Sequence, residues 1–131
     1  MLESRTLHIS IRRNWRDLYE QIWRPEMFPR WAAGLSKADL HRDGEAWKAQ
    51  GPAGPVTIRF TAHNPFGVMD HYVDTGSGPT VYVPLRVIAN ADGAEVQITL
   101  FRQPGMTDDT YRQDAESVER DLLALKKWVG G

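Results

Sequence analysis

Hydrophobic and polar residues alternate at the start of the chain, over residues 5 to 12. Period-two alternation is typical of a strand with one buried face, so a strand is predicted here. The apolar residues then recur at helical spacing, after Asn14 as a candidate N-cap. Pro25 ends this helix and suits the first turn of a second one, which would turn Phe28 and Trp31 inward. Two short helices are therefore expected directly after the first strand.

The period of two returns at residue 36 and continues to residue 102, with interruptions that favour turns. Asp43-Gly44 predicts a tight hairpin in which Leu40 lies opposite Trp47. Further strands are expected over residues 56–63, 68–74, 81–89 and 94–102. The last two should pair through their apolar faces across the turn at residues 90–93. Six strands are thus expected after the short helices.

The last apolar pattern is that of a long helix. Thr107 is a candidate N-cap, and acidic residues at 108 and 109 are favourable beside the positive end of the helix dipole. The expected apolar stripe consists of Tyr111, Ala115, Val118, Leu122, Leu125 and Val129. A helix with such a stripe buries it against the sheet. The prediction is an α+β fold formed by one domain over residues 1–131.

One ionisable residue is predicted to face the interior. Asn64-Pro65-Phe66-Gly67 has the composition of a turn, because Pro fixes φ and Gly accepts positive φ. If this turn places His63 opposite Val68, then Phe60 lies opposite His71. His71 would share the apolar face with Met69, while Asp70 would point to the other side of the sheet.

Composition excludes several classes of function. Sixteen basic and 17 acidic residues give a net charge of −1, so no concentrated positive surface for nucleic acid is expected. The chain has no cysteine, and its four histidines lack the spacing of metal ligands, so neither a metal nor another cofactor is expected. No apolar run is long enough for a signal peptide or a membrane span, which predicts a cytoplasmic protein.

The segment Trp23 to Trp31, WRPEMFPRW, and the terminal helix ending in Leu122 to Lys127, LLALKK, resemble the polyketide cyclase/dehydrase and lipid-transport group of the START/Bet v1-like superfamily. The resemblance covers nearly the whole chain. It implies a helix-grip fold, in which a curved antiparallel sheet of about seven strands surrounds the long C-terminal helix with an apolar cavity between them. Its members include lipid carriers, ligand receptors, aromatases and cyclases, so the fold implies no single reaction.

Two main functions follow from this pattern. The first is binding of a small apolar, aromatic or lipid-like molecule in the cavity. The residues expected to line it are Trp31, Trp47, Phe60, Met69, His71, Tyr111 and Val118. The alternative is a cyclase or dehydratase with His71 as general acid or base, and with Tyr111 or Arg86 steadying a developing enolate. Binding is preferred because only His71 is predicted inward, and acid-base cyclisation usually needs two such groups.

Three further possibilities stay open. His71 is also explained as a histidine at the edge of the core that bonds to a backbone group. Asp70 and Arg86 would form a charge ladder on the outer face, unless a one-residue slip at the Gly76 turn brings Arg86 inward beside His71. A partner protein could also use the mouth of the cavity.

The outer face of the sheet carries several large apolar residues. They are Tyr72, Tyr82, Ile88 and Phe101. Four such groups exceed what an isolated sheet face needs, which predicts a homodimer.

Overall fold

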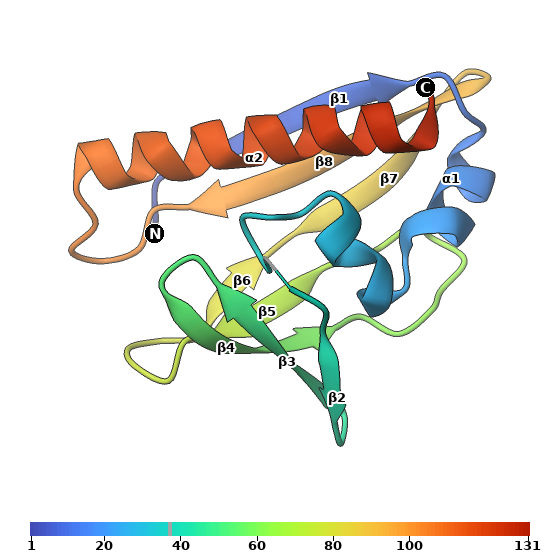
Figure 1. The fold of residues 1–131 in the computed structure, drawn as a ribbon. Coiled ribbons are helices and arrows are strands. Elements are labelled where there is room, and N and C mark those ends of the chain that lie inside the picture. Colours follow the sequence, from blue (N-terminus) through green and yellow to red (C-terminus); the bar gives the residue numbers. More distant parts are fainter. Residues whose placement is uncertain (37) are drawn as a thin grey trace.

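A computed structural model of the chain describes residues 1–36 and 38–131. The elements are β1 (Ser4–Ile11), α1 (Trp15–Ile22), the 3-10 helix η1 (Pro25–Arg30), β2 (His41–Asp43), β3 (Ala46–Gly51), β4 (Gly54–Phe60), β5 (His71–Asp74), β6 (Val81–Val83), β7 (Leu85–Asn90), β8 (Gly93–Phe101) and α2 (Asp108–Val129). Figure 1 shows α2 lying across β1 and β8, with the remaining strands extending away from it. The architecture is α+β, as predicted.

All strand pairs are antiparallel and form two connected groups. The orders are β1-β8-β7 and β2-β3-β4-β5-β6. The chain just before β5 joins the groups, because Val68 bridges to Arg86 and the Met69 amide donates to the Leu85 carbonyl at 2.8 Å. The strands therefore form one curved surface with α2 over one end, which is the expected helix-grip arrangement.

The predicted strand over residues 81–89 is divided into β6 and β7. Pro84 lies at the break, and proline has no amide hydrogen to contribute to a ladder. Beyond the break the apolar faces pair as predicted, with Leu85 opposite Ile98 and Val87 opposite Val96. The division explains why eight strands are found instead of about seven.

The two short helices are found in part, because only α1 is an α-helix. Its N-cap is the predicted one, since Asn14 Oδ1 accepts from the amides of Arg16 and Asp17 at 3.0 and 3.1 Å. The second segment, η1, is a 3-10 helix with Pro29 inside it. Proline cannot donate the hydrogen bond that an α-helix needs there, so the segment stays short.

The helix α2 has the predicted cap and stripe. The Thr107 side chain accepts from the Thr110 amide, and Gly130 ends the helix with φ of 74°. The stripe is buried against the sheet, with Leu122 at 2% and Leu125 at 0% exposure. This burial holds the sheet and α2 together as one core.

The hairpin β2–β3 differs from its predicted register. Arg42, not Leu40, lies opposite Trp47, and the two-residue loop is Gly44-Glu45. Gly44 has φ of 63°, and a positive φ at the first loop position alone is the pattern of a type II′ turn. The error is two residues, so Trp47 keeps its predicted face, while Leu40 is buried ahead of β2.

The turn at Asn64 is stabilised by its own side chain. Asn64 Oδ1 accepts from the amides of Phe66 and Val68 at 3.0 and 3.1 Å. Gly67 has φ of 71° and lies against the Val87 carbonyl, which leaves no space for a side chain. However, β4 ends at Phe60, so His63 does not pair with Val68 as predicted.

Candidate functional site

His71 lies inside the protein, at the predicted register opposite Phe60. Its side chain is 5% exposed. The Phe28 ring meets the imidazole edge-on at 5.6 Å between centroids, and the Phe60 ring lies 5.7 Å away. Phe28 also contacts Trp31, at 5.6 Å. These four residues, Phe28, Trp31, Phe60 and His71, are called the aromatic cluster.

Burial determines the protonation state of His71. Removal from water lowers its pKa to about 4, although the Met69 carbonyl and the Asp70 charge act in the opposite direction. The imidazole is therefore neutral at pH 7. Nδ1 lies 3.1 Å from the Met69 carbonyl, which can only accept, so Nδ1 carries the proton. Nε2 is then a hydrogen-bond acceptor, and it has no partner among the described residues.

The backbone bond to Met69 is the structural role foreseen for His71, and it accounts for one of the two ring nitrogens. Trp31 adds a polar group, its indole N–H, that makes no hydrogen bond among the described residues. Its side chain is 2% exposed. Buried indole N–H groups usually have a partner. The aromatic cluster thus contains one free donor and one free acceptor.

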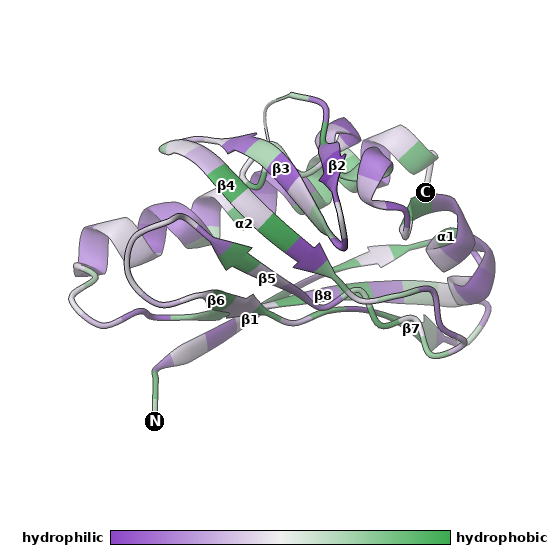
Figure 2. Ribbon diagram, turned by 90° about the horizontal axis from the view of Figure 1, so that it is seen from below, coloured by the Kyte–Doolittle hydropathy of each residue, from purple (hydrophilic) through white to green (hydrophobic). Residues whose placement is uncertain are grey.

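A groove opens beside this cluster and shares Phe60 with it. It has a volume of about 700 Å³ and lies between the start of η1, the β2–β3 hairpin and the end of β4. Its lining comprises Trp23, Arg24, Pro25, Glu26, Arg42, Glu45, Trp47, Arg59, Phe60, Thr61, Ala62 and His63. Figure 2 shows that hydropathy alternates along β4. Successive residues of a strand point to opposite faces, so Arg59 and Phe60 lie on opposite sides of β4. The groove, here the Trp23–Trp47 groove, therefore reaches round the end of β4.

One wall of the groove is a column of stacked side chains. The Arg24 guanidinium lies 5.2 Å above the Trp23 ring, and the His63 ring lies 4.5 Å from it on a nearly parallel plane. Tyr19 stacks on His63 at 5.7 Å, and Glu20 bonds to His63 Nε2 at 2.7 Å. These contacts explain why His63 leaves the sheet instead of pairing with Val68.

The other predicted lining residues occupy different positions. Trp47 lines the groove, Met69 is 3% exposed beside His71, and Val118 is half-buried in α2. Tyr111 is buried, but its hydroxyl donates to the Leu100 carbonyl at 3.0 Å. That hydroxyl is therefore already used within the fold.

Arg86 lies on the outer face of the sheet. Its Nη2 and Nε approach the two carboxylate oxygens of Asp70 at 2.9 and 3.2 Å. Burial opposes the charged form of Asp70, yet hydrogen bonds from Arg86, Tyr82 and Leu85 together hold its pKa below the ordinary value. The alternative register that brings Arg86 beside His71 is wrong, because β5 and β6 pair without a slip. The two residues do not meet at one site.

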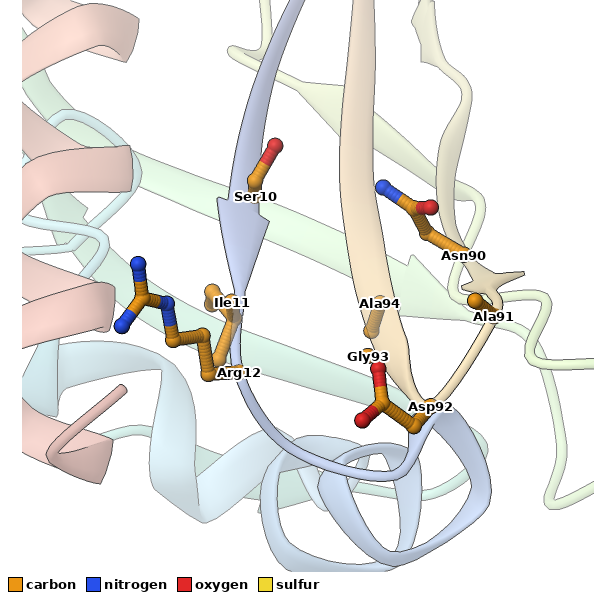
Figure 3. Close-up of a pocket in the computed structure, with 8 residues that line it drawn as sticks. All are labelled: Ser10, Ile11, Arg12, Asn90, Ala91, Asp92, Gly93 and Ala94. Atoms are coloured by element: carbon orange, nitrogen blue, oxygen red, sulfur yellow. The ribbon is translucent and has the colours of Figure 1, made fainter.

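A second hollow lies at the other end of the molecule, where β1 meets the β7–β8 turn. It has a volume of about 430 Å³. Figure 3 shows that the Arg12 side chain points away from Asp92 and Asn90 on the turn. Asn90 donates to Glu95 at 2.9 Å. The polar groups do not converge, so this hollow is not a candidate site.

In the described part of the chain, no group of three histidine or acidic residues is arranged to hold a metal ion. No helix there is long and apolar enough to cross a membrane.

Sequence reasoning found Trp47 and Phe60 but missed most of the groove. Trp23, Arg24, Arg42 and Arg59 come from three separate segments. The sequence pointed to only one part of the groove, because Trp23 and Arg24 belong to the segment that carries the family resemblance.

Comparison with known proteins shows the fold. No protein-family profile and no curated protein sequence matches the chain. DynU16, from the dynemicin biosynthetic locus, aligns over 97% of this chain with a TM-score of 0.72 and 16% identity. The chain spans about half of DynU16, 47% of its length.

Two further solved structures match over nearly their whole length. Ara h 8.0201 matches with a TM-score of 0.70 and 13% identity, over 98% of both chains. The Aha1 dimer of Colwellia psychrerythraea matches with a TM-score of 0.71 and 15% identity, over 95% of this chain and 94% of that one. These likenesses show that the chain has the START/Bet v1-like fold.

Proposed function

We propose that the protein binds a small apolar or aromatic molecule at the aromatic cluster, with the Trp23–Trp47 groove as the entrance. The observation that carries this proposal is the buried indole N–H of Trp31, which has no partner among the described residues. An unpaired buried donor costs about 1–3 kcal/mol. A ligand with an oxygen acceptor would remove that cost.

His71 supports the same proposal, because it supplies a hydrogen-bond acceptor in the same cluster as the Trp31 donor. Its Nε2 can accept a hydrogen bond and the Trp31 indole can donate one, and both rings lie beside Phe28. A hydroxyl group both donates and accepts. A neutral aromatic alcohol or phenol therefore fits the cluster, with its ring against Phe28 and Phe60.

Catalysis is less well supported than binding. A cyclase or dehydratase needs a base with a pKa near the working pH, whereas the pKa of His71 is lowered to about 4 by burial. Arg86 lies on the outer face with Asp70, and the Tyr111 hydroxyl bonds to Leu100. Neither is free to steady an enolate next to His71. The name of DynU16 places that protein in a biosynthetic locus, which is compatible with either a carrier or an enzyme.

Calorimetric titration with 2-naphthol tests the proposal. We expect one saturable site, and weaker binding by the variant Trp31→Phe, which keeps an aromatic ring but removes the donor. A lost hydrogen bond of about 1 kcal/mol corresponds to roughly a fivefold change in Kd. Trp128→Phe, in the last turn of α2, is the matched control and should bind as the wild type does. Absence of saturable binding, or equal effects of the two substitutions, would contradict the proposal.

A further inference from the structure

The Trp23–Trp47 groove contains charged side chains that the fold does not use. Three arginines and two glutamates line it, Arg24, Arg42, Arg59, Glu26 and Glu45. Among the described residues, no ion pair joins any of these five to a partner. Elsewhere, Arg86 and Arg102 form ion pairs with acidic residues.

Two of the three guanidinium groups are free of hydrogen bonds as well. Arg42 Nε donates to the Gly44 carbonyl at 3.1 Å, within its own hairpin. The guanidinium groups of Arg24 and Arg59 have no hydrogen bond among the described residues. Arg24 is nevertheless held in position, because it lies over the Trp23 ring at 5.2 Å. A positioned, unpaired guanidinium is suited to binding a planar oxyanion.

The neutral polar groups of the groove favour the same kind of ligand. The indole Nε1 of Trp23 is buried and has no partner among the described residues. Like a guanidinium, it can only donate. The two glutamates leave an excess of one positive charge among the five charged side chains. A ligand that complements the free donors must therefore supply acceptor oxygens.

The apolar groups of the groove define the rest of the ligand. Trp47 and Phe60 are half-buried, and both line the groove. Phe60 also lies 4.7 Å from Phe28 in the aromatic cluster. Phe60 therefore belongs both to the groove and to the aromatic cluster that contains His71.

We propose that the Trp23–Trp47 groove binds the carboxylate of an aromatic acid through Arg24 and Arg59, while the ring of that acid lies against Trp47 and Phe60. The ligand class is thus an aromatic or largely apolar carboxylic acid. This inference rests on the proposed function, because the apolar part continues into the aromatic cluster. Beyond the proposed function, the inference specifies that the polar head group is a carboxylate and that Arg24 and Arg59 bind it.

The test compares two probes of the same shape. Calorimetric titrations with 2-naphthoate and with 2-naphthamide differ only in the charge of the head group. We expect the wild type to bind 2-naphthoate about tenfold more tightly, the size of one charge-assisted hydrogen bond. The double variant Arg24→Gln/Arg59→Gln should reduce this preference to about twofold or less. Added salt should weaken only the binding of the acid.

Arg12→Gln is the matched control, because Arg12 lines the other hollow (Figure 3). It should leave the preference unchanged. Equal affinity of the wild type for both probes, or equal effects of the control and the double variant, would overturn the inference. The proposed function has its own readout, because 2-naphthol carries no charge at pH 7. Binding of 2-naphthol without a preference for 2-naphthoate would overturn the head-group inference alone.

Discussion

His71 and Phe60 lie directly opposite each other on β5 and β4, with their ring centroids 5.7 Å apart on the inner face of the sheet. The neighbouring Asp70 lies on the outer face, paired with Arg86. Two adjacent ionisable residues are thus placed in opposite environments. The inner one is kept neutral by burial, whereas the outer one is kept charged by its donors.

The first prediction concerns His71 and pH. Its pKa is about 4 in the folded protein and 6.5 in the unfolded chain, so only the unfolded chain gains a proton between these values. Stability should therefore fall as pH is lowered from 7 to 4.5, by about 2–3 kcal/mol at most. Urea unfolding at both pH values should show this loss in the wild type and not in His71→Gln. The control is His41→Gln in the exposed strand β2, and a pH dependence unchanged in His71→Gln would refute the prediction.

Asp121 should have the opposite effect in the same pH range. Burial raises its pKa to about 6, although the Gly34 amide donates to its carboxylate at 3.2 Å. The folded protein then takes up a proton before the unfolded chain does, so this residue adds stability as pH falls from about 6 toward 4.

Asp121→Asn keeps an oxygen for Gly34 and removes the charge. We expect it to stabilise the protein at pH 7, by about 1 kcal/mol or less because solvent screens a group that is only partly buried. Thermal unfolding at pH 7 and pH 5 measures the effect, and the benefit should shrink at pH 5. Asp39→Asn, in an exposed loop, is the control. A variant less stable than the wild type at pH 7 would contradict this assignment.

Asp70 should contribute more to the free energy of unfolding than its ion-pair partner Arg86. Asp70 also accepts from the Tyr82 hydroxyl at 2.7 Å and from the Leu85 amide at 2.9 Å. Asp70→Ala leaves these donors unpaired and should cost about 1–3 kcal/mol. Arg86→Gln removes only an exposed partner and should cost less than about 1 kcal/mol. The two free energies of unfolding, measured at pH 7, decide the matter, and similar losses would show the pair to act as one unit.

The same pair predicts a loss of stability in acid. The pKa of Asp70 is lowered in the folded protein, so its contribution is present above about pH 4 and disappears as pH falls further. In Asp70→Ala this part of the acid dependence should be absent.

The outer face of the sheet is expected to bind a second copy of the chain. Tyr72 stacks on Tyr82 at 5.0 Å, and Tyr82 lies 6.2 Å from Phe101. Tyr72 and Ile88 are 49% and 40% exposed, so this apolar part of the outer face is accessible to a partner. Sedimentation equilibrium should give a dimer for the wild type and a monomer for Phe101→Lys.

A control on another face separates this effect from a general change in solubility. Leu123 is 62% exposed on α2, so Leu123→Lys should leave the dimer intact. A monomeric wild type at high micromolar concentration would rule out the predicted surface. The fold is compatible with dimers, since the Aha1 dimer of Colwellia psychrerythraea shares it.

Most of the fold follows from local sequence patterns. Period-two and helical spacing identified every major element, because each element buries one face. The face of His71 followed from the strand period, since a strand residue faces the same way as its second neighbour, although the pairing of His63 with Val68 expected at the Asn64 turn does not form. The register of β2–β3 was wrong by two residues, because a two-residue loop fits either Asp43-Gly44 or Gly44-Glu45.

The candidate site depended on tertiary structure to a greater degree. Trp23, Trp47 and Arg59 are far apart in the sequence and meet only because η1 and the β2–β3 hairpin fold beside the end of β4. The partners of polar groups were equally unpredictable, since the spacing of residues does not say whether an indole N–H or a guanidinium finds an acceptor. The sequence by itself determined which face of each element is apolar, a short-range property of the chain. Only the tertiary structure decided which polar groups remain free, because that depends on contacts between distant segments.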